Sequence, residues 1–192
     1  MKIVLATNNK HKIKELSEVL EGYFDEVLPI GQLGVGAEID ETGSTFKENS
    51  YIKAAYICKE TGLAALADDS GLCVDALGGE PGVYSARYSG LGDAGNNSLL
   101  LEKMSGISNR RAQFVCCIAL ALPDGQTLFA DGALHGSIAH GPAGENGFGY
   151  DPLFVPDGYD ITLAQLSPEE KNKISHRALA VMALKKRLEN LQ

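Results

Sequence analysis

The sequence predicts an α/β fold built on a mixed β-sheet. The first third of the chain alternates short apolar runs with segments whose apolar residues recur every three or four positions, a pattern of strand and helix in turn. Later, two long apolar runs flank "PDGQ", a turn sequence that favours an antiparallel hairpin. Strand–helix alternation followed by a hairpin indicates a mixed sheet. With 192 residues, 44% of them hydrophobic, the chain is long enough to bury a core, and a single domain over 1–192 is expected.

Strands and helices alternate in the first part of the chain. The expected elements are a strand at 2–6, a polar loop at 7–12, a helix that stops at Gly22, a strand at 25–30, a glycine-rich connection at 31–36, a helix from about Thr45 to Gly62, and a strand that ends at Ala67. The first helix is indicated by Ile13, Leu16 and Leu20, which share one helical face. Thr45 and Glu48 have the spacing of a capping box and indicate the start of the second. The core-facing residues of this second helix are expected to be Tyr51, Ala54, Ala55 and Cys58.

The second part of the chain contains the hairpin and an irregular segment. The expected elements are a Gly- and Pro-punctuated loop at 78–90 that holds Arg87, a helix at 97–104, strands at 113–122 and 127–140, a helix that starts after Ser167, and a last helix from about Ser175. That last helix is expected to bury Val181, Leu184, Leu188 and Leu191. Segment 141–156 carries four glycines and three prolines around aromatic residues, which favours a binding loop over a plain linker.

Charge and composition limit the partners. The chain has 17 Lys and Arg against 25 Asp and Glu, a net charge of −8, so it gains nothing from the counterion release that drives nucleic-acid binding. The N-terminal "MKIVLATNN" has only a short apolar run, and no segment approaches 18 uninterrupted apolar residues, so a cytosolic protein without a membrane partner is expected. The cysteines form no CxxC pair and are expected to be small buried residues, not a zinc site or disulfides: Cys58, Cys73, Cys116 and Cys117.

Two neighbouring carboxylates, Asp68 and Asp69, follow the third apolar strand. Two such charges about 4 Å apart repel by roughly 4 kcal/mol at an effective dielectric constant near 20, so beside a buried strand they require a cation or a proton. The alternative is that one of them caps a turn. Strand alternation lets at most one of the two point into any given cleft. Glu41 is a candidate second oxygen ligand for Mg²⁺, which usually takes one or two carboxylates, or else a solvated loop charge.

Several polar groups are candidates for binding an anionic ligand. The strand, the loop "TNNKHK" and the helix that follows form a phosphate-binding arrangement in principle, with Lys12 as its principal residue, or simply a polar loop that caps a helix. Lys53 is either a phosphate ligand or a surface lysine. "SHR" at 175–177 gathers donors at a helix start, or Ser175 merely caps that helix. "FGYD" at 148–151 offers aromatic faces for a base, or aromatics that close the core edge. His11, His135 and His140 have no ligand spacing.

Six blocks of the sequence resemble, in order, the motifs of the inosine triphosphate pyrophosphatase family. They are "LATNNKHK", "ETGSTFKENSYIKA", "ADDSGL", "PGVYSARYSG", "GFGYDPLF" and "KNKISHR". The match runs from Lys2 to the final helix. It implies an elongated mixed sheet flanked by helices, two lobes with a central cleft, and a homodimer. It also implies Mg²⁺-dependent hydrolysis of ITP, dITP, XTP and dXTP to the monophosphate and pyrophosphate, which cleanses the nucleotide pool.

The resemblance also assigns roles to residues. It implies that Asp69 is a metal ligand and general base, that Glu41 is the second metal carboxylate, and that Asp68 supports them. The positions that resemble the family's substrate-binding residues are Thr7, Asn8, Asn9, Lys10, His11, Lys12, Lys53, Ser70, Phe148, Gly149, Tyr150, Asp151, Lys171, His176 and Arg177. Asn8 stands where the family often has glycine. Donors from His176, Arg177 or the main chain would prefer the 6-oxo group of hypoxanthine or xanthine to the 6-amino group of ATP.

Two other functions remain open at this point. A related pyrophosphatase for modified pyrimidine or methylated nucleotides would use the same cations and a different base pocket. A nucleotide sensor would bind in the same place without turnover.

Overall fold

A computed structural model gives the structure of the chain and describes residues 1–34 and 39–189. The chain folds into two compact units. The first comprises Met1–Asp69, Cys116–Gly132 and the segment from Arg177 onward, and the second comprises Ser70–Val115 and Ala133–His176. The division at Asp69 and Ser70 falls inside the motif "ADDSGL".

The described strands form one mixed sheet in the order β2-β1-β3-β4-β5-β6. The strands are β1 (Lys2–Leu5), β2 (Glu26–Pro29), β3 (Ala64–Val74), β4 (Arg111–Ala121), β5 (Thr127–Ile138) and β6 (Phe154–Pro156). The α-helices are α1 (Lys10–Leu20), α2 (Phe46–Thr61), α3 (Gly92–Lys103), α4 (Pro168–Ile174) and α5 (His176–Glu189), and the short 3-10 helices are η1 (Ile30–Leu33), η2 (Asp75–Leu77), η3 (Gly82–Arg87) and η4 (Leu163–Gln165). β1 is parallel to β2 and β3, whereas β5 and β6 are antiparallel. The predicted α/β class with a mixed sheet is confirmed.

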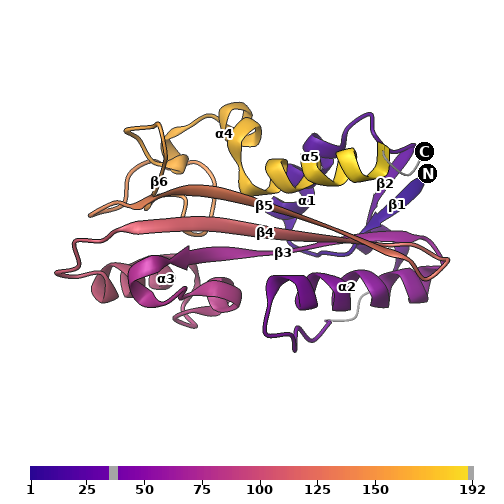
Figure 1. Cartoon of the computed structure of the whole chain (residues 1–192), viewed down its shortest axis with the longest axis horizontal. Helices are drawn as coiled ribbons and strands as arrows, with labels where there is room; N and C mark the ends of the chain where they lie inside the picture. The colour runs from indigo at the N-terminus through magenta and orange to yellow at the C-terminus, as the bar shows by residue number, and fades with distance from the viewer. Residues whose placement is uncertain (35–38, 190–192) are drawn as a thin grey trace. The chain divides into compact units, whose positions relative to one another are not determined.

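The first unit has a buried cluster on each face of its part of the sheet. Figure 1 shows α1 and α5 over one face and α2 over the other. The cluster on the α1 and α5 face includes Ile3, Leu5, Leu16, Leu20, Ala64, Leu66, Cys116, Ile118, Leu120, Val181 and Leu184. The cluster on the α2 face includes Val4, Ala6, Ala54, Ile57, Cys58, Ala65, Ala67, Ala119 and Ala121. Successive strand residues alternate between the two faces, and the many alanines let α2 pack close to the sheet.

The acidic pair lies in the middle of β3, not at the end of a strand. We expected the strand to stop at Ala67, but it continues for seven more residues to Val74. The continuation carries Leu72 and Val74, whose side chains are buried in the core of the second unit. The sequence pattern predicts an early end of the strand because two charges and a glycine lower the local strand propensity. Burial of residues farther along the strand outweighs this low propensity.

Helix α2 is capped as predicted but buries a different face. The side chain of Thr45 accepts from the Glu48 amide, the Glu48 side chain accepts in return, and Gly62 ends the helix in the left-handed conformation. Tyr51, predicted to face the core, is 47% exposed. The described buried residues of α2 are Asn49, Ser50, Lys53, Ala54, Ile57 and Cys58. The prediction failed because it sought an apolar stripe, and half of the buried stripe is polar.

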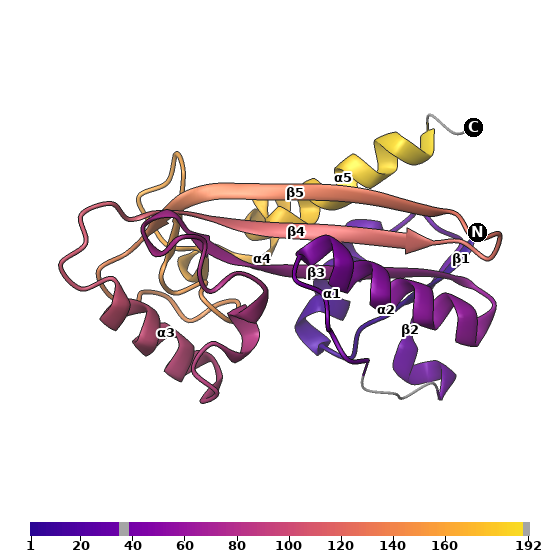
Figure 2. The same cartoon turned by 60° about the horizontal axis from the view of Figure 1, so that its bottom comes forward.

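The second unit has a core of its own. Figure 2 shows α3 within this unit. Leu100 of α3 and Met104, which follows the helix as its C-cap, belong to the same buried cluster as Leu72 and Val74 of β3. Helix α3 begins at Gly92, five residues earlier than expected. A Cβ at Gly95 would lie 2.5 Å from the Leu91 Cβ, so a poor helix former occupies a position where a larger residue does not fit.

Other predicted elements lie close to their expected places. α4 has Pro168 at its first turn and a capping box from Ser167. In α5, Val181 and Leu184 are buried and Leu188 packs against the same cluster. Leu191 and the last two residues of the expected glycine-rich connection lie outside the described residues.

All four cysteines lie in the described part of the chain. The four cysteines are unpaired thiols; Cys73 is half-buried and the other three are buried. Among residues 1–34 and 39–189, no helix has the length and apolar character needed to cross a membrane.

Candidate active site

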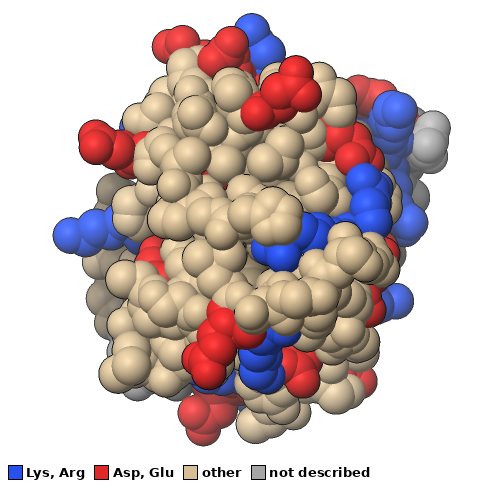
Figure 3. Space-filling model, turned by 90° about the vertical axis from the view of Figure 1, so that its left-hand side faces the viewer, with Lys and Arg blue, Asp and Glu red and all other residues tan. Residues whose placement is uncertain are grey.

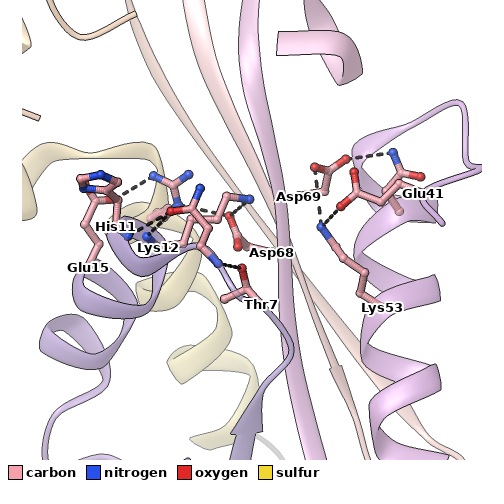
Figure 4. Close-up of polar contacts among 11 residues, drawn as sticks. Thr7, His11, Lys12, Glu15, Glu41, Lys53, Asp68 and Asp69 are labelled. Carbon is pink, nitrogen blue, oxygen red and sulfur yellow. Dashed lines mark hydrogen bonds and ion pairs between the residues drawn. The ribbon is translucent and has the colours of Figure 1, made fainter. Parts of the chain in front are cut away.

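Asp68 lies at the centre of a buried ionic cluster in the first unit. Its Oδ2 lies 3.1 Å from the Lys12 Nζ and 3.1 Å from the Arg177 Nε, and the Arg177 Nη1 donates to Glu15 Oε2 at 2.7 Å. We call these four residues the Asp68 cluster. Because position 68 has the same parity as Ala64 and Leu66, the side chain points to the α1 and α5 face (Figure 4). Lys12 and Arg177, both predicted to bind substrate, thus contact the same carboxylate.

The charges of the Asp68 cluster stabilise one another. Burial alone would raise the pKa of Asp68, but the ammonium of Lys12 and the guanidinium of Arg177 outweigh it and hold this pKa far below its usual range. Burial would likewise lower the pKa of Arg177, but Asp68 and Glu15 raise it. Asp68 is therefore ionised at neutral pH and holds two cations in place.

Asp69 points to the opposite face of β3, into a second cluster. Its Oδ2 accepts from the Asn49 Nδ2 at 3.0 Å, and its Oδ1 lies 3.9 Å from the Lys53 Nζ. The same ammonium donates to Glu41 Oε1 at 2.5 Å. We call Asp69, Asn49, Lys53 and Glu41 the Asp69 cluster, and Figure 4 shows it separated from the Asp68 cluster by the β3 ribbon.

The Asp69 cluster is less well neutralised. Burial raises the pKa of Asp69, the charge of Lys53 and the hydrogen bond from Asn49 offset this only in part, and Glu41 adds to the rise. Lys53 is 8% exposed, so it is not a surface lysine. Two carboxylates that converge on one cation form a donor set that fits Mg²⁺, which takes one or two protein carboxylates together with phosphates and water.

Asn49 was not predicted as a site residue, and it fixes the geometry of the Asp69 cluster. Its Oδ1 accepts from the Gly43 amide at 2.8 Å, so its Nδ2 is directed at Asp69. A Cβ on Gly43 would lie 2.7 Å from that Oδ1. This one amide thus ties the segment that carries Glu41 to the carboxylate of β3. The signal was present in the sequence, because Asn49 lies one helical turn before Lys53.

The predicted phosphate loop is partly helix. α1 begins at Lys10, and Asn9 is its N-cap, whose Oδ1 accepts from the amides of His11 and Lys12 at 3.0 and 3.2 Å. Asn9 itself donates its amide to Thr7 Oγ1 at 3.2 Å. The loop therefore does cap a helix, and the amides of His11 and Lys12 are directed to Asn9. Asn8, Asn9, Lys10 and His11 are exposed.

The order of the strands explains why this loop lies beside the acidic pair. β1 and β3 are parallel, with Leu5 opposite Leu66, and the Ala6 amide donates to the Leu66 carbonyl at 2.8 Å. The loop after β1 therefore emerges next to Asp68. Ligand sites of α/β proteins commonly lie at such strand ends.

Four of the remaining predicted residues form a group in the second unit. The Asp151 Oδ2 accepts from the Phe148 amide at 2.9 Å and from the Lys171 Nζ at 2.7 Å. The Lys171 Nζ also lies 4.8 Å from the centroid of the Phe148 ring. Tyr150 is buried and its hydroxyl donates to the Ser85 carbonyl at 2.8 Å.

The motif "SHR" is divided between the units. The His176 ring, in the second unit, is buried and stacks on Phe114 with centroids 4.9 Å apart. Arg177 belongs to the first unit, and two of its nitrogens already contact Asp68 and Glu15. Glu15, three residues after Lys12, is the other member of the clusters that was not predicted. Ser70, half-buried, begins the second unit.

Known proteins resemble this chain over almost its whole length. A dITP/XTP pyrophosphatase of Exiguobacterium sp. is 49% identical over 186 residues, which cover 96% of this chain and 95% of that protein. A dITP/XTP pyrophosphatase of Bacillus subtilis is 45% identical over 190 residues, which cover 97% of this chain and 96% of that protein.

Solved structures and a family model also match this chain over almost its whole length. The Ham1 protein of Staphylococcus aureus superposes with a TM-score of 0.90 at 44% identity, covering 100% of both chains. A nucleoside-triphosphatase / dITP/XTP pyrophosphatase of Mycobacterium abscessus gives a TM-score of 0.78 at 49% identity, covering 96% of this chain and 97% of that one. The model of the Ham1 family matches residues 3–187. With this coverage in sequence and in structure, the chain belongs to the Ham1 family.

Proposed function

We propose that this protein hydrolyses non-standard purine nucleoside triphosphates, namely ITP, dITP, XTP and dXTP, to the nucleoside monophosphate and pyrophosphate. The relatives described above are named dITP/XTP pyrophosphatases. The observation that carries the proposal is the Asp69 cluster, in which a buried carboxylate of raised pKa and Glu41 converge on one cation. Such an arrangement suits a reaction that needs both a bound cation and a carboxylate near the reacting phosphorus.

Cationic side chains of the first unit would bind the triphosphate. Lys12 and Lys53 each pair with a carboxylate of β3, so their ammonium groups are held at defined places beside that strand. Lys171, in the second unit, is held by Asp151 in the same way. Neutralising a triphosphate with such groups leaves the α-phosphorus open to attack by water.

Glu41 and Asp69 are the residues that would hold Mg²⁺. Bound there, the ion would neutralise phosphate charge and polarise the phosphorus centre. Lys53, which now pairs with both carboxylates, would then be available to a phosphate oxygen. Its ammonium lies closer to Glu41 than to Asp69, so its movement would release mainly Glu41.

Asp69 would orient the attacking water and accept its proton. A bond forms between the water oxygen and the α-phosphorus, the bond from that phosphorus to the oxygen bridging to the β-phosphate breaks, and pyrophosphate leaves. A raised pKa suits a carboxylate that must accept a proton near neutral pH. The hydrogen bond from Asn49 to Oδ2 leaves Oδ1 as the oxygen that faces the cation.

The purine base would be recognised by groups of the motifs "FGYD" and "SHR". The Phe148 ring offers a face for stacking. Groups of His176, of Arg177 or of the main chain would donate hydrogen bonds to a 6-oxo group, whereas the 6-amino group of ATP would leave these donors unpaired. The burial of His176 and Arg177 raises the cost of such an unpaired donor.

A substrate panel tests the proposal. Pyrophosphate and phosphate release are measured with ITP, XTP, ATP, GTP and dUTP, each with and without Mg²⁺. We expect Mg²⁺-dependent release of pyrophosphate, fastest with ITP and XTP. A rate with ITP no higher than with ATP would refute the purine selectivity, and dUTP as the best substrate would favour a pyrimidine enzyme.

The proposal extends to assembly and surroundings. We propose a homodimer, which light scattering would detect as twice the mass of one chain. The cytoplasm is the proposed compartment, and unpaired cysteines are typical of it. Nucleic acid is not a proposed partner: on the face in Figure 3, Lys and Arg are interspersed with Asp and Glu, and the described residues there form no continuous basic stripe.

A further inference from the structure

Helix α3 holds both polar backbone groups of Gly149, which lies in the loop at 147–151. The Gly149 amide donates to Asp93 Oδ2 at 2.7 Å, and the Gly149 carbonyl accepts from the Asn97 Nδ2 at 2.9 Å. Positions 93 and 97 are four residues apart, so both side chains leave the same face of the helix. Gly149 has a φ of +61°, a conformation that other residues rarely adopt. The helix therefore fixes both polar groups of a residue whose backbone only glycine readily supplies.

Further contacts fix the same loop on either side of Gly149. Asp151 accepts from the Phe148 amide and from Lys171, and Tyr150 is buried with its hydroxyl on the Ser85 carbonyl. We call residues 147–151 the aromatic loop. Each of its residues 148–151 thus makes at least one of these hydrogen bonds, through the main chain at Phe148 and Gly149 and through the side chain at Tyr150 and Asp151. The Phe148 ring is carried on this framework with the Lys171 ammonium over it.

Asn97 holds the loop at a cost to stability. Its Oδ1 is buried and has no hydrogen-bond partner among residues 1–34 and 39–189. A buried acceptor without a partner is unfavourable, and an apolar side chain of similar shape would avoid the penalty. Packing of α3 alone therefore does not account for an asparagine at position 97. The hydrogen bond from the Asn97 side chain to the Gly149 carbonyl accounts for it.

We propose that Asp93 and Asn97 are positioning residues for base recognition. They act through Gly149, which they hold so that the aromatic loop presents Phe148 to the purine. This inference rests on the proposed function and deepens it, because it assigns control of the base site to a helix that none of the recognised motifs includes. Loss of the hydrogen bonds that Asp93 and Asn97 make with Gly149 would displace the aromatic loop and weaken binding of the base. The Asp69 cluster and the phosphate-binding lysines of the first unit would stay intact.

The test separates base binding from phosphate binding and from stability. The main variant is Asn97→Leu, which removes both the donor and the unpaired acceptor. We expect the KM for ITP to rise about tenfold, as for loss of a buried hydrogen bond, with kcat within about twofold. Inhibition by inorganic tripolyphosphate, which has no base, should be unchanged, and the Tm should be equal to or above that of the parent protein.

A second variant and a control complete the experiment. Asp93→Ala, at an exposed position, should also raise the KM for ITP. Asp93→Asn should have a KM close to that of the parent protein, because an amide oxygen can still accept from the Gly149 amide. The control is Ser98→Ala on the same helix, whose hydroxyl donates to the Ala94 carbonyl and not to the loop. It should leave the KM, the kcat and the tripolyphosphate inhibition unchanged.

The outcomes distinguish this inference from the proposed function. An unchanged KM in both Asn97→Leu and Asp93→Ala, in a parent that prefers ITP, overturns the inference alone. A lower Tm with equal loss of ITP and tripolyphosphate binding means that α3 serves only to stabilise the fold, and also overturns it. A parent that does not prefer ITP to ATP overturns the proposed function and this inference with it.

Discussion

The two clusters on either side of β3 differ although their carboxylates are neighbours in the sequence. Asp68 contacts two cations at 3.1 Å each, and its pKa is lowered. Asp69 accepts from the Asn49 amide and lies 3.9 Å from the Lys53 ammonium, which also pairs with Glu41. Its pKa is raised, mainly by burial. In the Asp68 cluster two carboxylates pair with two cations, whereas in the Asp69 cluster two carboxylates converge on one cation.

This difference assigns different roles to chemically identical side chains. Asp68 holds Lys12 and Arg177 in place, and removing its charge leaves these two cations without their shared counter-charge. A carboxylate of raised pKa that shares one cation with a second carboxylate is a better proton acceptor and suits a metal ion. The separation follows from the strand period, because two successive residues of a strand cannot share one face.

The largest expected effect is on catalysis. Asp69→Asn should lower kcat by about 10³-fold, because it removes both a metal ligand and the proton acceptor while keeping size and the Asn49 contact. Binding of ITP, measured by calorimetry, should largely persist. Initial rates of pyrophosphate release measure the loss.

An exposed carboxylate gives the matched control for that variant. Asp157 pairs with Arg111 on the surface of the second unit, so Asp157→Asn should hydrolyse ITP like the parent. Hydrolysis by Asp69→Asn at the parental rate would contradict the assignment of the reaction to the Asp69 cluster. Tight ITP binding by a parent with no Mg²⁺-dependent turnover would instead favour a nucleotide sensor.

The next effect is on stability and concerns the other carboxylate. Asp68→Asn should lower the free energy of unfolding by about 3 kcal/mol, because Arg177 and Lys12 would remain buried without their shared counter-charge. Urea denaturation measures this loss. Asp69→Asn should show no comparable loss, since burial disfavours the charge that it removes. Equal destabilisation by the two variants would refute the distinction between the clusters.

Sequence reasoning was most successful where local signals agree with the tertiary structure. The capping box at Thr45, the stop at Gly62, the helix start after Ser167 and the order of strands and helices are all present. It failed at β3, whose length depends on burial of Leu72 and Val74 in a core formed by residues distant in sequence. Propensity at 68–71 carries no information about that core.

The site could be predicted only in part for a similar reason. Alternation in a strand indicates that Asp68 and Asp69 diverge, but not which cations each would meet. Glu15 and Asn49 were missed because a glutamate or an asparagine on a helix is usually solvated, and their roles appear only when α1 and α2 are placed on opposite faces of the sheet. The contacts of α3 with Gly149 likewise join residues that are 52 and 56 positions apart.

The smallest expected effect is a difference in how the two variants respond to pH. The raised pKa of Asp69 contributes stability that is fully present below its unfolded value, near 3.9, and is lost as pH rises through the folded value. Asn does not titrate, so Asp69→Asn should be more stable than the parent at neutral pH, and this gain should vanish near about pH 4.

Asp68 should behave in the opposite way. Its lowered pKa contributes stability that is present above the unfolded value and is lost as pH falls toward the folded one. The loss in Asp68→Asn should therefore be full at neutral pH and should shrink only below about pH 4. Urea unfolding without Mg²⁺, at neutral pH and at about pH 4, measures both differences, and each tenfold change in proton affinity is worth about 1.4 kcal/mol. A gain for Asp69→Asn that grew toward acid pH would mean that Asp69, like Asp68, is ionised and paired in the folded chain, and the two faces of β3 would then be equivalent.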